Sequence, residues 1–163
     1  MLTEAQAWQA LEAVPDPEVP VVSVVELGIV RALDCGDNGV TVTVTPTYSG
    51  CPATEVIAEH IRDALLAAGA RAVSLQTRLD PPWTSDWIGD AARAKLRAYG
   101  IVPPDGKAPV GAARPLRFVR KTLACPRCGS SDTERLSEFG STACKATYRC
   151  RSCLEPFEYF KPI

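Results

Sequence analysis

Cys125-Pro-Arg-Cys128 and Cys150-Arg-Ser-Cys153 lie toward the end of the chain, separated by residues 129–149. Two residues stand between the thiols of each pair, so that a tight turn can point both sulfurs at one ion. Four thiolates from two such turns suit a tetrahedral Zn²⁺ ion. Because four protein ligands leave no coordination position for water or substrate, the pattern predicts a structural zinc ribbon. Iron or an iron–sulfur cluster, two disulfides, and four unrelated buried thiols are the alternatives.

The composition of the 163-residue chain fits a globular domain joined to a small metal-stabilised module. Hydrophobic residues make up 46% and charged residues 23%, which provides enough apolar surface for a packed core. Seven cysteines, an odd number, argue against a secreted disulfide framework. The segment Met1–Gln6 lacks the features of a secretory signal, and no apolar run reaches membrane-spanning length. We therefore expect a cytoplasmic protein with reduced thiols and no membrane partner.

Hydrophobic periodicity predicts a layer of helices packed on about three strands in the first hundred residues. The stretch from Val40 to Thr45 alternates valine and threonine and is the clearest strand. Thr3 and Gln6 form a capping-box pattern ahead of a first helix. The other expected elements are strands over 29–35 and 72–79, a hairpin turn at 37–39, and helices over 52–68 and 86–99.

The domain organisation follows from these elements. We expect an α/β body over residues 1–100, a linker rich in proline and glycine over 101–115, and a β-rich zinc ribbon over 116–163. The fold class is therefore α+β. Basic residues are in excess over 116–163 and acidic residues over the rest, which is ordinary surface variation.

Cys51 is a second candidate for sulfur chemistry. It follows Gly50 and precedes Pro52, at the expected start of a helix. Free backbone N–H groups and the positive end of the helix dipole stabilise a thiolate at such a place. Gly50 permits a ligand to approach the backbone closely. A cysteine at a helix start often only packs, so its local sequence leaves both a functional and a packing role open.

Two carboxylates lie in a loop that Pro17 and Pro20 stiffen. Asp16 and Glu18 have the chemistry to ligate a metal or to accept a proton. A rigid surface turn is the simpler interpretation of the same residues.

Other residues carry weaker signals. His60, the single histidine, falls on the expected apolar stripe of its helix and lies too far along it from Cys51 for a catalytic dyad. Cys144 is interpreted as a small buried side chain, with a fifth ligand or a redox thiol as alternatives. Trp83 and Trp87 flank a helix start, where they either frame a partner groove or lock the helix entry.

Three motifs together resemble the metal–sulfur-cluster assembly domain of the SufT/MIP type. They are Asp16-Pro17-Glu18, Glu26-Leu27-Gly28-Ile29-Val30 and Thr45-Pro46-Thr47-Tyr48-Ser49-Gly50-Cys51-Pro52. Joined to the Trp83–Trp87 cluster, the stretch Tyr99–Pro104 and the terminal ribbon, nearly the whole chain resembles the PaaD (PaaJ) family of bacterial aerobic phenylacetate degradation. Glu26 departs from the pattern, because such domains commonly carry Asp before Leu-Gly.

The resemblance implies an accessory role, not an enzymatic one, beside the multicomponent phenylacetyl-CoA 1,2-epoxidase, a ring monooxygenase. That complex has a di-iron oxygenase and a reductase carrying flavin and a [2Fe–2S] cluster, and the family is associated with assembling or inserting the iron–sulfur centre. Carried over by residue, Cys51 is the thiol that transiently binds iron or a cluster, with Asp16, Glu18 and Thr47 around it. The zinc ligands are then Cys125, Cys128, Cys150 and Cys153. The implied partners are the reductase and oxygenase subunits or the iron–sulfur assembly machinery.

Two other functions remain as alternatives. The protein can be a structural subunit of the oxygenase complex without metal transfer. Alternatively, the ribbon can bind nucleic acid through its basic residues, although the acidic body argues against this function. These are Arg117, Arg120, Lys121, Arg127, Arg149 and Arg151. The sequence leaves a homo-oligomer open.

Overall fold

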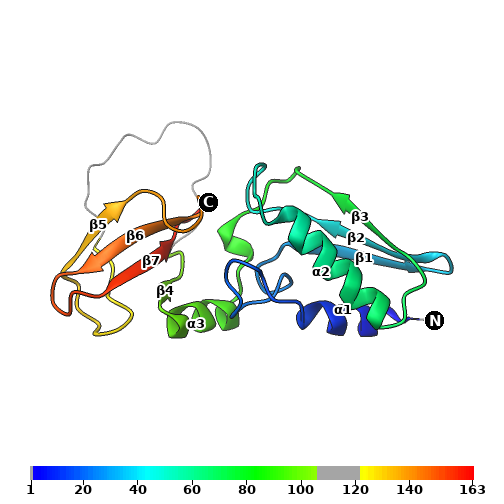
Figure 1. The fold of residues 1–163 in the computed structure, drawn as a ribbon, viewed down its shortest axis with the longest axis horizontal. Coiled ribbons are helices and arrows are strands. Elements are labelled where there is room, and N and C mark those ends of the chain that lie inside the picture. The colour runs from blue at the N-terminus through cyan, green and yellow to red at the C-terminus, as the bar shows by residue number, and fades with distance from the viewer. Residues whose placement is uncertain (1, 106–121) are drawn as a thin grey trace. The chain divides into compact units, whose positions relative to one another are not determined.

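The computed structural model describes residues 2–105 and 122–163 and divides the chain into two units (Figure 1). Unit 1 comprises Met1–Trp83 and Trp87–Ala92, and unit 2 comprises Thr84–Asp86 and Arg93–Ile163. The chain crosses between the units three times: after Trp83, within the short 3₁₀ helix η1 (Ser85–Trp87) and within α3 (Asp90–Tyr99). Most of the helix expected at the end of the α/β body therefore groups with the C-terminal unit.

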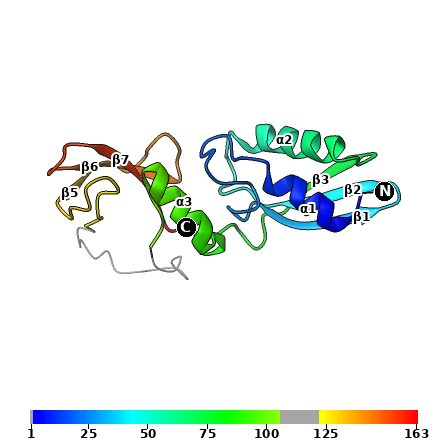
Figure 2. The same ribbon diagram turned by 90° about the horizontal axis from the view of Figure 1, so that it is seen from below.

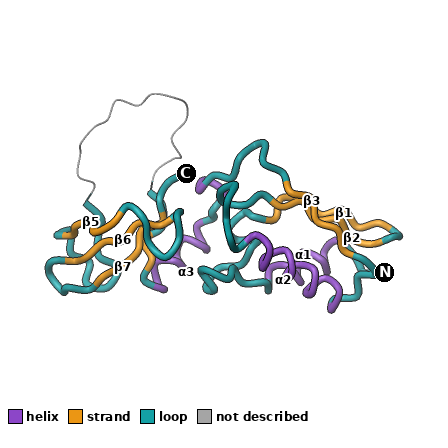
Figure 3. Tube along the Cα trace, turned by 45° about the horizontal axis from the view of Figure 1, so that its top comes forward, coloured by secondary structure: helices purple, strands orange, loops and turns teal. Residues whose placement is uncertain are grey.

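Unit 1 is a three-stranded sheet with two helices on one face (Figures 2 and 3). Its strands are β1 (Val30–Gly36), β2 (Gly39–Val44) and β3 (Val73–Thr77). The central strand β2 is antiparallel to β1 and parallel to β3. The first helix, α1 (Glu4–Glu12), contacts β1, and the second, α2 (Thr54–Ala67), contacts β3. This arrangement confirms the expected α+β class.

The core of unit 1 follows the two periodicities that the sequence shows. Alternate residues of β2 point to the helices, and residues spaced by about one turn of α2 point back to the sheet. The buried side chains are Val40, Val42 and Val44 of β2 and Ile57, Ile61 and Leu65 of α2. The threonines between the valines are half-buried on the opposite face of the sheet.

The helix ends in unit 1 were predicted with mixed success. The Thr3 hydroxyl accepts from the Gln6 N–H and the Gln6 side chain accepts from the Thr3 N–H, so the capping box is confirmed. Gly69, with φ of 104°, follows the end of α2 as expected. The prediction that α2 begins at Pro52 is wrong, because a turn precedes the helix and Thr54 is its first residue. Within the described residues no helix has the length and apolar character to span a membrane.

Unit 2 contains a four-stranded sheet in the order β4-β7-β6-β5. The strands are β4 (Ile101–Val102), β5 (Thr133–Ser137), β6 (Lys145–Cys150) and β7 (Pro156–Phe160). β6 is antiparallel to both of its neighbours, and β4 is parallel to β7. The predicted linker therefore begins with a short strand, because Ile101 is buried and pairs with β7. Beyond Asp105 that linker, and the start of the predicted ribbon up to residue 121, lie outside the described residues.

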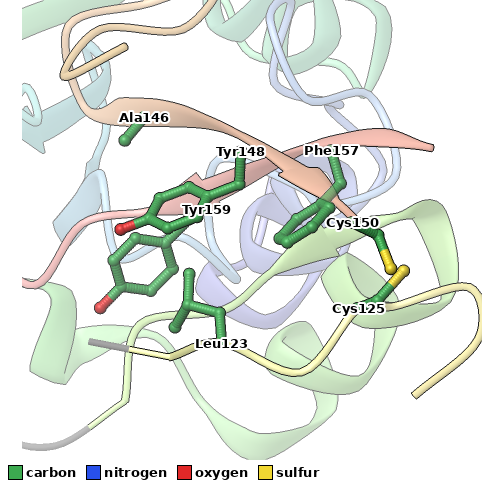
Figure 4. Packing of buried hydrophobic residues seen from close by; sticks show 7 residues of the cluster. All are labelled: Leu123, Cys125, Ala146, Tyr148, Cys150, Phe157 and Tyr159. Carbon is green, nitrogen blue, oxygen red and sulfur yellow. The ribbon is translucent and has the colours of Figure 1, made fainter. Parts of the chain in front are cut away.

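Aromatic rings from β6 and β7 form the core of unit 2 (Figure 4). Tyr148 stacks on Phe157 with ring centroids 5.8 Å apart and meets Tyr159 edge-on at 5.9 Å. Cys125 and Cys150 belong to the same buried cluster, as Figure 4 shows. The hydrophobic core of the ribbon therefore includes two of the predicted metal ligands.

Candidate functional site

Four thiols from the two Cys-x-x-Cys turns gather at one point of unit 2. The sulfurs of Cys125, Cys128, Cys150 and Cys153 all lie within 4.8 Å of one another. The Cys125 and Cys153 sulfurs are 3.7 Å apart, and the Cys128 and Cys150 sulfurs are 3.5 Å apart. A tetrahedral site with Zn–S bonds of about 2.3 Å places its sulfurs about 3.8 Å from one another. The quartet therefore fits an ion of this size and geometry.

The two turns that carry these thiols share one backbone design. The N–H of Cys125 donates to the carbonyl of Ser130 at 2.9 Å, and the N–H of Cys150 donates to the carbonyl of Glu155 at 3.0 Å. In each turn the residue after the second cysteine has a positive φ, 74° at Gly129 and 63° at Leu154. The ribbon thus holds its ligands on two equivalent knuckles.

Each knuckle contributes one buried and one exposed thiol. Cys125 and Cys150 are buried, whereas Cys128 and Cys153 are exposed. The N–H of Cys153 donates to the Cys150 sulfur at 3.5 Å, and this bond outweighs burial and lowers the pKa of Cys150 to about 6. A thiolate at neutral pH is the form that binds a metal.

A buried ion pair supports the loop between β5 and β6. Lys145 is 1% exposed, and its ammonium lies 2.8 Å from a carboxylate oxygen of Glu158. The other oxygen of Glu158 accepts from the N–H of Ser141 at 2.7 Å. A Cβ at Gly140 would lie 2.5 Å from that oxygen, so a larger residue there would displace the Glu158 carboxylate. Sequence reasoning missed this pair, because Lys145 is a charged residue in a strand with no motif to mark it.

Cys51 lies in the loop between β2 and α2 as a half-buried free thiol. Its N–H donates to the Tyr48 carbonyl at 3.2 Å, and its own carbonyl accepts from the hydroxyl of Thr54 at 2.8 Å. Ala53 is the N-cap of α2, so Cys51 lies ahead of the helix and not at its first residue. A Cβ on Gly50 would have no other atom within 4 Å, which leaves the space beside Gly50 open.

The carboxylates grouped with Cys51 by resemblance have different surroundings. Asp16 is 6% exposed, and its Oδ1 accepts from the N–H groups of Glu18 at 2.9 Å and Val19 at 2.8 Å. It therefore shapes its own loop, while Glu18 and Thr47 are half-buried. Across residues 2–105 and 122–163, the ribbon quartet is the one group of three or more Cys, His, Asp or Glu side chains placed to share an ion. Cys51, Asp16 and Glu18 do not form a preassembled three-ligand site.

Glu26 makes a reciprocal pair of hydrogen bonds with Ser23. Its carboxylate accepts from the N–H of Ser23 at 2.9 Å, and its own N–H donates to the Ser23 hydroxyl at 3.1 Å. This reciprocal pair has the form of a capping box and closes the turn that leads into Leu27 and Gly28. The Ser-x-x-Glu spacing was the signal in the sequence.

Trp83 and Trp87 pack on that same turn within unit 1. Trp83 is 4% exposed, and its indole N–H donates to the Leu27 carbonyl at 2.8 Å. The guanidinium of Arg31 lies 3.6 Å from the centroid of the Trp87 ring. Gly28 has a φ of 71°, and a Cβ there would lie 2.9 Å from the Cβ of Trp87. The two tryptophans thus fix the Leu27–Gly28 turn, a packing role that the sequence did not reveal.

His60 and Cys144 belong neither to the ribbon thiol quartet nor to the loop that carries Cys51. His60 is exposed on α2, so its predicted position on the apolar stripe is wrong. The buried face of the helix is instead set by Ile57, Ile61 and Leu65. Cys144 is 5% exposed, its sulfur lies 2.9 Å from the Thr142 hydroxyl, and it stands outside the metal-ligand group. The interpretation of Cys144 as a small buried side chain fits this position.

Two protein families match different parts of the chain. The family described as iron-sulfur cluster assembly protein matches residues 4–75, a range that contains Cys51 and the residues grouped with it. The family described as the PaaD zinc beta ribbon domain matches residues 111–161, a range that contains the whole thiol quartet.

One relative matches nearly the whole chain, whereas others, and the solved structures, match a little over half of it. A protein of Escherichia coli (strain K12), named as a candidate subunit of 1,2-phenylacetyl-CoA epoxidase, is 48% identical over 158 residues, which cover 97% of this chain and 92% of that protein. The Fe-S protein maturation auxiliary factor of Porphyromonas gingivalis is 35% identical and covers 58% of this chain and 90% of that protein. The crystal structure of a DUF59 domain of unknown function from Bacillus anthracis aligns with a TM-score of 0.53 at 28% identity, covering 57% of this chain and 90% of that one. The chain therefore belongs to the PaaD family, in which an iron–sulfur cluster assembly domain is joined to a zinc beta ribbon.

Proposed function

We propose that this protein is an accessory maturation factor for phenylacetyl-CoA 1,2-epoxidase, assisting iron–sulfur cluster assembly or insertion in the reductase of that enzyme. The observation that carries the proposal is an iron–sulfur assembly domain within a chain 48% identical to the Escherichia coli candidate epoxidase subunit. The Porphyromonas gingivalis relative, named as an Fe-S protein maturation factor, supports the same class of function. In this role the protein handles a cluster and does not itself oxidise substrate. Free cysteines throughout the described chain suit the reducing cytoplasm.

Cys51 is the thiol that binds the cargo. Its half-buried position on a loop leaves it within reach of solvent, and the space beside Gly50 gives iron or a cluster room to approach. Ala53 caps α2 without a side-chain hydrogen bond, and although the Cys51 carbonyl accepts from the N–H of Thr54, the positive end of the helix dipole favours negative charge on a cluster bound ahead of the helix. Since the described residues supply Cys51 with no complete ligand set, the remaining coordination comes from sulfide, from the client or from a second copy of the chain.

The neighbours of Cys51 have supporting roles in this proposal. Asp16 is buried and orders the loop through two backbone hydrogen bonds to its Oδ1. Glu18 and Thr47, both half-buried, are grouped with the thiol by the family resemblance.

The ribbon quartet holds a resident Zn²⁺ ion, which supplies folding free energy and no reactive position. The sulfur spacing fits zinc, and so does the match to a zinc ribbon family. A module of this size buries too little apolar surface to be stable alone, and a structural zinc site contributes on the order of 10 kcal/mol.

Reconstitution with Fe²⁺ and sulfide under argon tests the role of Cys51. We expect the wild type to gain iron, labile sulfide and visible absorption, and the Cys51→Ala variant to lose most of all three. Cys35→Ala is the matched control, because Cys35 is also a half-buried free thiol in unit 1. If Cys51→Ala acquires as much iron and absorption as the wild type, the proposed role of Cys51 is wrong.

A structural subunit of the oxygenase complex is the second candidate, favoured by the word subunit in the name of the Escherichia coli relative. Co-purification with the reductase and oxygenase distinguishes the two functions. A maturation factor is absent from the purified active enzyme, whereas a structural subunit remains at a fixed ratio and is required for activity after the clusters are in place.

Nucleic-acid binding receives little support from the described part of the ribbon, and three of the candidate cations, Arg117, Arg120 and Lys121, lie outside the described residues. Arg127 pairs with Glu155 at 2.7 Å, and Arg151 pairs with Glu134 at 2.7 Å. Arg149 pairs with Glu134 as well. Each of these arginines is therefore engaged by a carboxylate, with Arg149 and Arg151 sharing the single charge of Glu134, while a phosphate-binding surface needs cations available to phosphate.

A further inference from the structure

The two exposed cysteines of this chain are both predicted metal ligands. All seven cysteines lie within the described residues, and only Cys128 and Cys153 are exposed. Each is the second cysteine of its knuckle, and the residue that follows it, Gly129 or Leu154, is exposed as well. A small solute dissolved in water can therefore reach both knuckle tips.

Exposure and metal binding together favour oxidation at these two thiols. Peroxide reacts with a thiolate and not with a neutral thiol, and a thiol that coordinates a metal ion has lost its proton. Thiols outside the quartet meet these conditions less well. Cys144 is buried and Cys51 is half-buried. Burial, together with the charges of Glu4 and Asp34, raises the pKa of Cys35 and keeps its thiol protonated at neutral pH.

Each exposed thiol lies against a buried thiol of the opposite knuckle. The Cys153 sulfur is 3.7 Å from that of Cys125, and the Cys128 sulfur is 3.5 Å from that of Cys150. A cysteine oxidised to the sulfenic acid condenses with a neighbouring thiolate to form a disulfide. In each pair the buried thiolate is therefore placed to react with the exposed sulfur once that sulfur has been oxidised.

We infer that Cys128 and Cys153 are oxidation sites by which hydrogen peroxide releases the metal ion from the ribbon. In the first step the exposed thiolate attacks peroxide, so that an S–O bond forms, the O–O bond breaks and hydroxide leaves. In the second step the buried thiolate attacks the sulfenic sulfur, so that the S–S bond forms and the S–O bond breaks as a second hydroxide leaves. The two thiolates lose two electrons to one peroxide, and two protons from solvent convert the hydroxides to water.

Formation of the disulfides removes both the metal site and the support that it gives to the ribbon. Each disulfide consumes two of the four thiolates, and a disulfide sulfur no longer binds zinc as a thiolate does. Cys125 and Cys150 belong to the buried cluster that contains Tyr148 and Tyr159, so the change reaches the ribbon core. The oxidation chemistry is independent of the proposed function, but the consequence that peroxide halts cluster delivery to the client rests on it.

Zinc-loaded full-length protein treated with hydrogen peroxide tests this inference. Zinc release is followed with a chromophoric chelator, and the disulfides are mapped by mass spectrometry after the remaining thiols are blocked. The double variant Cys128→His, Cys153→His replaces both exposed thiols with imidazole ligands, which bind zinc and form no disulfide. Cys144→Ala is the matched control, because it removes a ribbon thiol outside the quartet. A carbon nucleophile that traps sulfenic acids locates the first oxidation in the wild type, without any substitution.

We expect the wild type and Cys144→Ala to release zinc at the same rate, with disulfides joining Cys125 to Cys153 and Cys128 to Cys150. The double histidine variant should release zinc about tenfold more slowly, because its remaining thiols are buried. The sulfenic-acid trap should label Cys128 and Cys153 in the wild type. A dithiol reductant with added Zn²⁺ should then restore the metal content and the near-UV circular dichroism of the ribbon.

Other results overturn the inference. The wild type should not retain zinc at a peroxide concentration that oxidises Cys51 completely, and the double histidine variant should not release zinc as fast as the wild type. Trap adducts on Cys125 or Cys150, or disulfides within one knuckle, contradict the assigned sites. Zinc release that the reductant does not reverse indicates damage instead of a switch. The proposed function fails separately, since Cys51→Ala that loads iron as well as the wild type contradicts that function and leaves the oxidation of the ribbon in place.

Discussion

Gly50 lies directly before Cys51, and the structure separates its role in the fold from a role in binding. A Cβ at Gly50 would meet no other atom within 4 Å, and its φ is not in the left-handed region. We therefore predict that Gly50→Ala changes the free energy of unfolding by no more than about 0.5 kcal/mol. If the cargo approaches this backbone, the same variant binds markedly less iron after anaerobic reconstitution.

Thermal denaturation and iron analysis of one preparation test this prediction. Gly39→Ala is the structural contrast, because a Cβ there would lie 2.4 Å from the Ala72 carbonyl oxygen at a φ of 143°. Gly39→Ala should lower the melting temperature without a specific effect on iron binding by the remaining folded protein. Full iron loading by Gly50→Ala would contradict the proposed approach of the cargo beside Gly50.

The Lys145–Glu158 pair makes a second prediction about single residues. Glu158→Gln leaves the buried ammonium of Lys145 without a charged partner, so it should lower the free energy of unfolding of the ribbon by about 3–5 kcal/mol. Replacing both residues, Lys145→Met with Glu158→Leu, should recover most of that loss. Denaturant titration of the zinc-loaded proteins measures both effects. If Glu158→Gln lowers the free energy of unfolding no more than loss of an exposed ion pair does, the buried pair does not stabilise the ribbon as predicted.

The titration of the Glu158 carboxyl group determines how the stability difference between wild type and Glu158→Gln depends on pH. Burial raises the pKa of Glu158, but the ion pair with Lys145 and the N–H of Ser141 outweigh it and hold the pKa below the ordinary value of 4.5. A lowered folded-state pKa stabilises the protein at pH values above the unfolded pKa, and this contribution is lost as pH falls through the folded pKa. The stability difference between wild type and Glu158→Gln should therefore be constant from pH 8 to pH 5. A steady decline across that range would contradict the assignment.

Residues whose role depends on local geometry could be predicted, and those that depend on distant partners could not. The zinc ligands follow from the spacing of cysteines within two tight turns. The capping box follows from Thr3 and Gln6, which are three positions apart in the sequence. Lys145 and Glu158 meet only because β6 and β7 pair with Thr147 opposite Glu158. That register is a long-range property, so no local pattern marks the pair.

The loop that carries Trp83 makes a prediction about how elements are held together. The Trp83 indole N–H donates to the Leu27 carbonyl at 2.8 Å in a buried site. Trp83→Phe should keep most of the packing and remove this donor, lowering the free energy of unfolding by about 1–3 kcal/mol. Trp8→Phe is the matched control, because the Trp8 indole bonds the exposed Glu4 carboxylate at 3.4 Å. Equal melting temperatures for the two variants would contradict the importance of this hydrogen bond.

Elements with a strong internal pattern were predictable from the sequence. The valine–threonine alternation gives β2 and its buried face, and the helical spacing of Ile57, Ile61 and Leu65 gives α2. The start of α2 was not predictable from Pro52, because the Thr54 side chain and N–H bond the Cys51 carbonyl and delay the helix. β4 was missed because Ile101–Val102 becomes a strand only by pairing with β7, far along the chain.

At the scale of the whole molecule, we predict that the two units respond differently to loss of metal. A strong chelator under reducing conditions should unfold the ribbon and leave unit 1 folded, because the metal ligands all belong to unit 2. The three tryptophans, Trp8, Trp83 and Trp87, all belong to unit 1, whereas Tyr148 and Tyr159 are in the ribbon core. Native tryptophan fluorescence should therefore persist while the tyrosine contribution to near-UV circular dichroism is lost. Cys125→Ser should reproduce this state without chelator, and simultaneous loss of both signals would contradict it.

The central claim is that Cys51 transfers an iron–sulfur centre to the reductase, and cluster transfer measures it most directly. Protein loaded anaerobically is mixed with apo-reductase, and recovery of the reductase cluster is followed by electron paramagnetic resonance and by reductase activity. We expect the wild type and Cys35→Ala to restore the cluster faster than free Fe²⁺ and sulfide, and Cys51→Ala to do no better than those reagents alone. Equal restoration by wild type and Cys51→Ala would contradict the account.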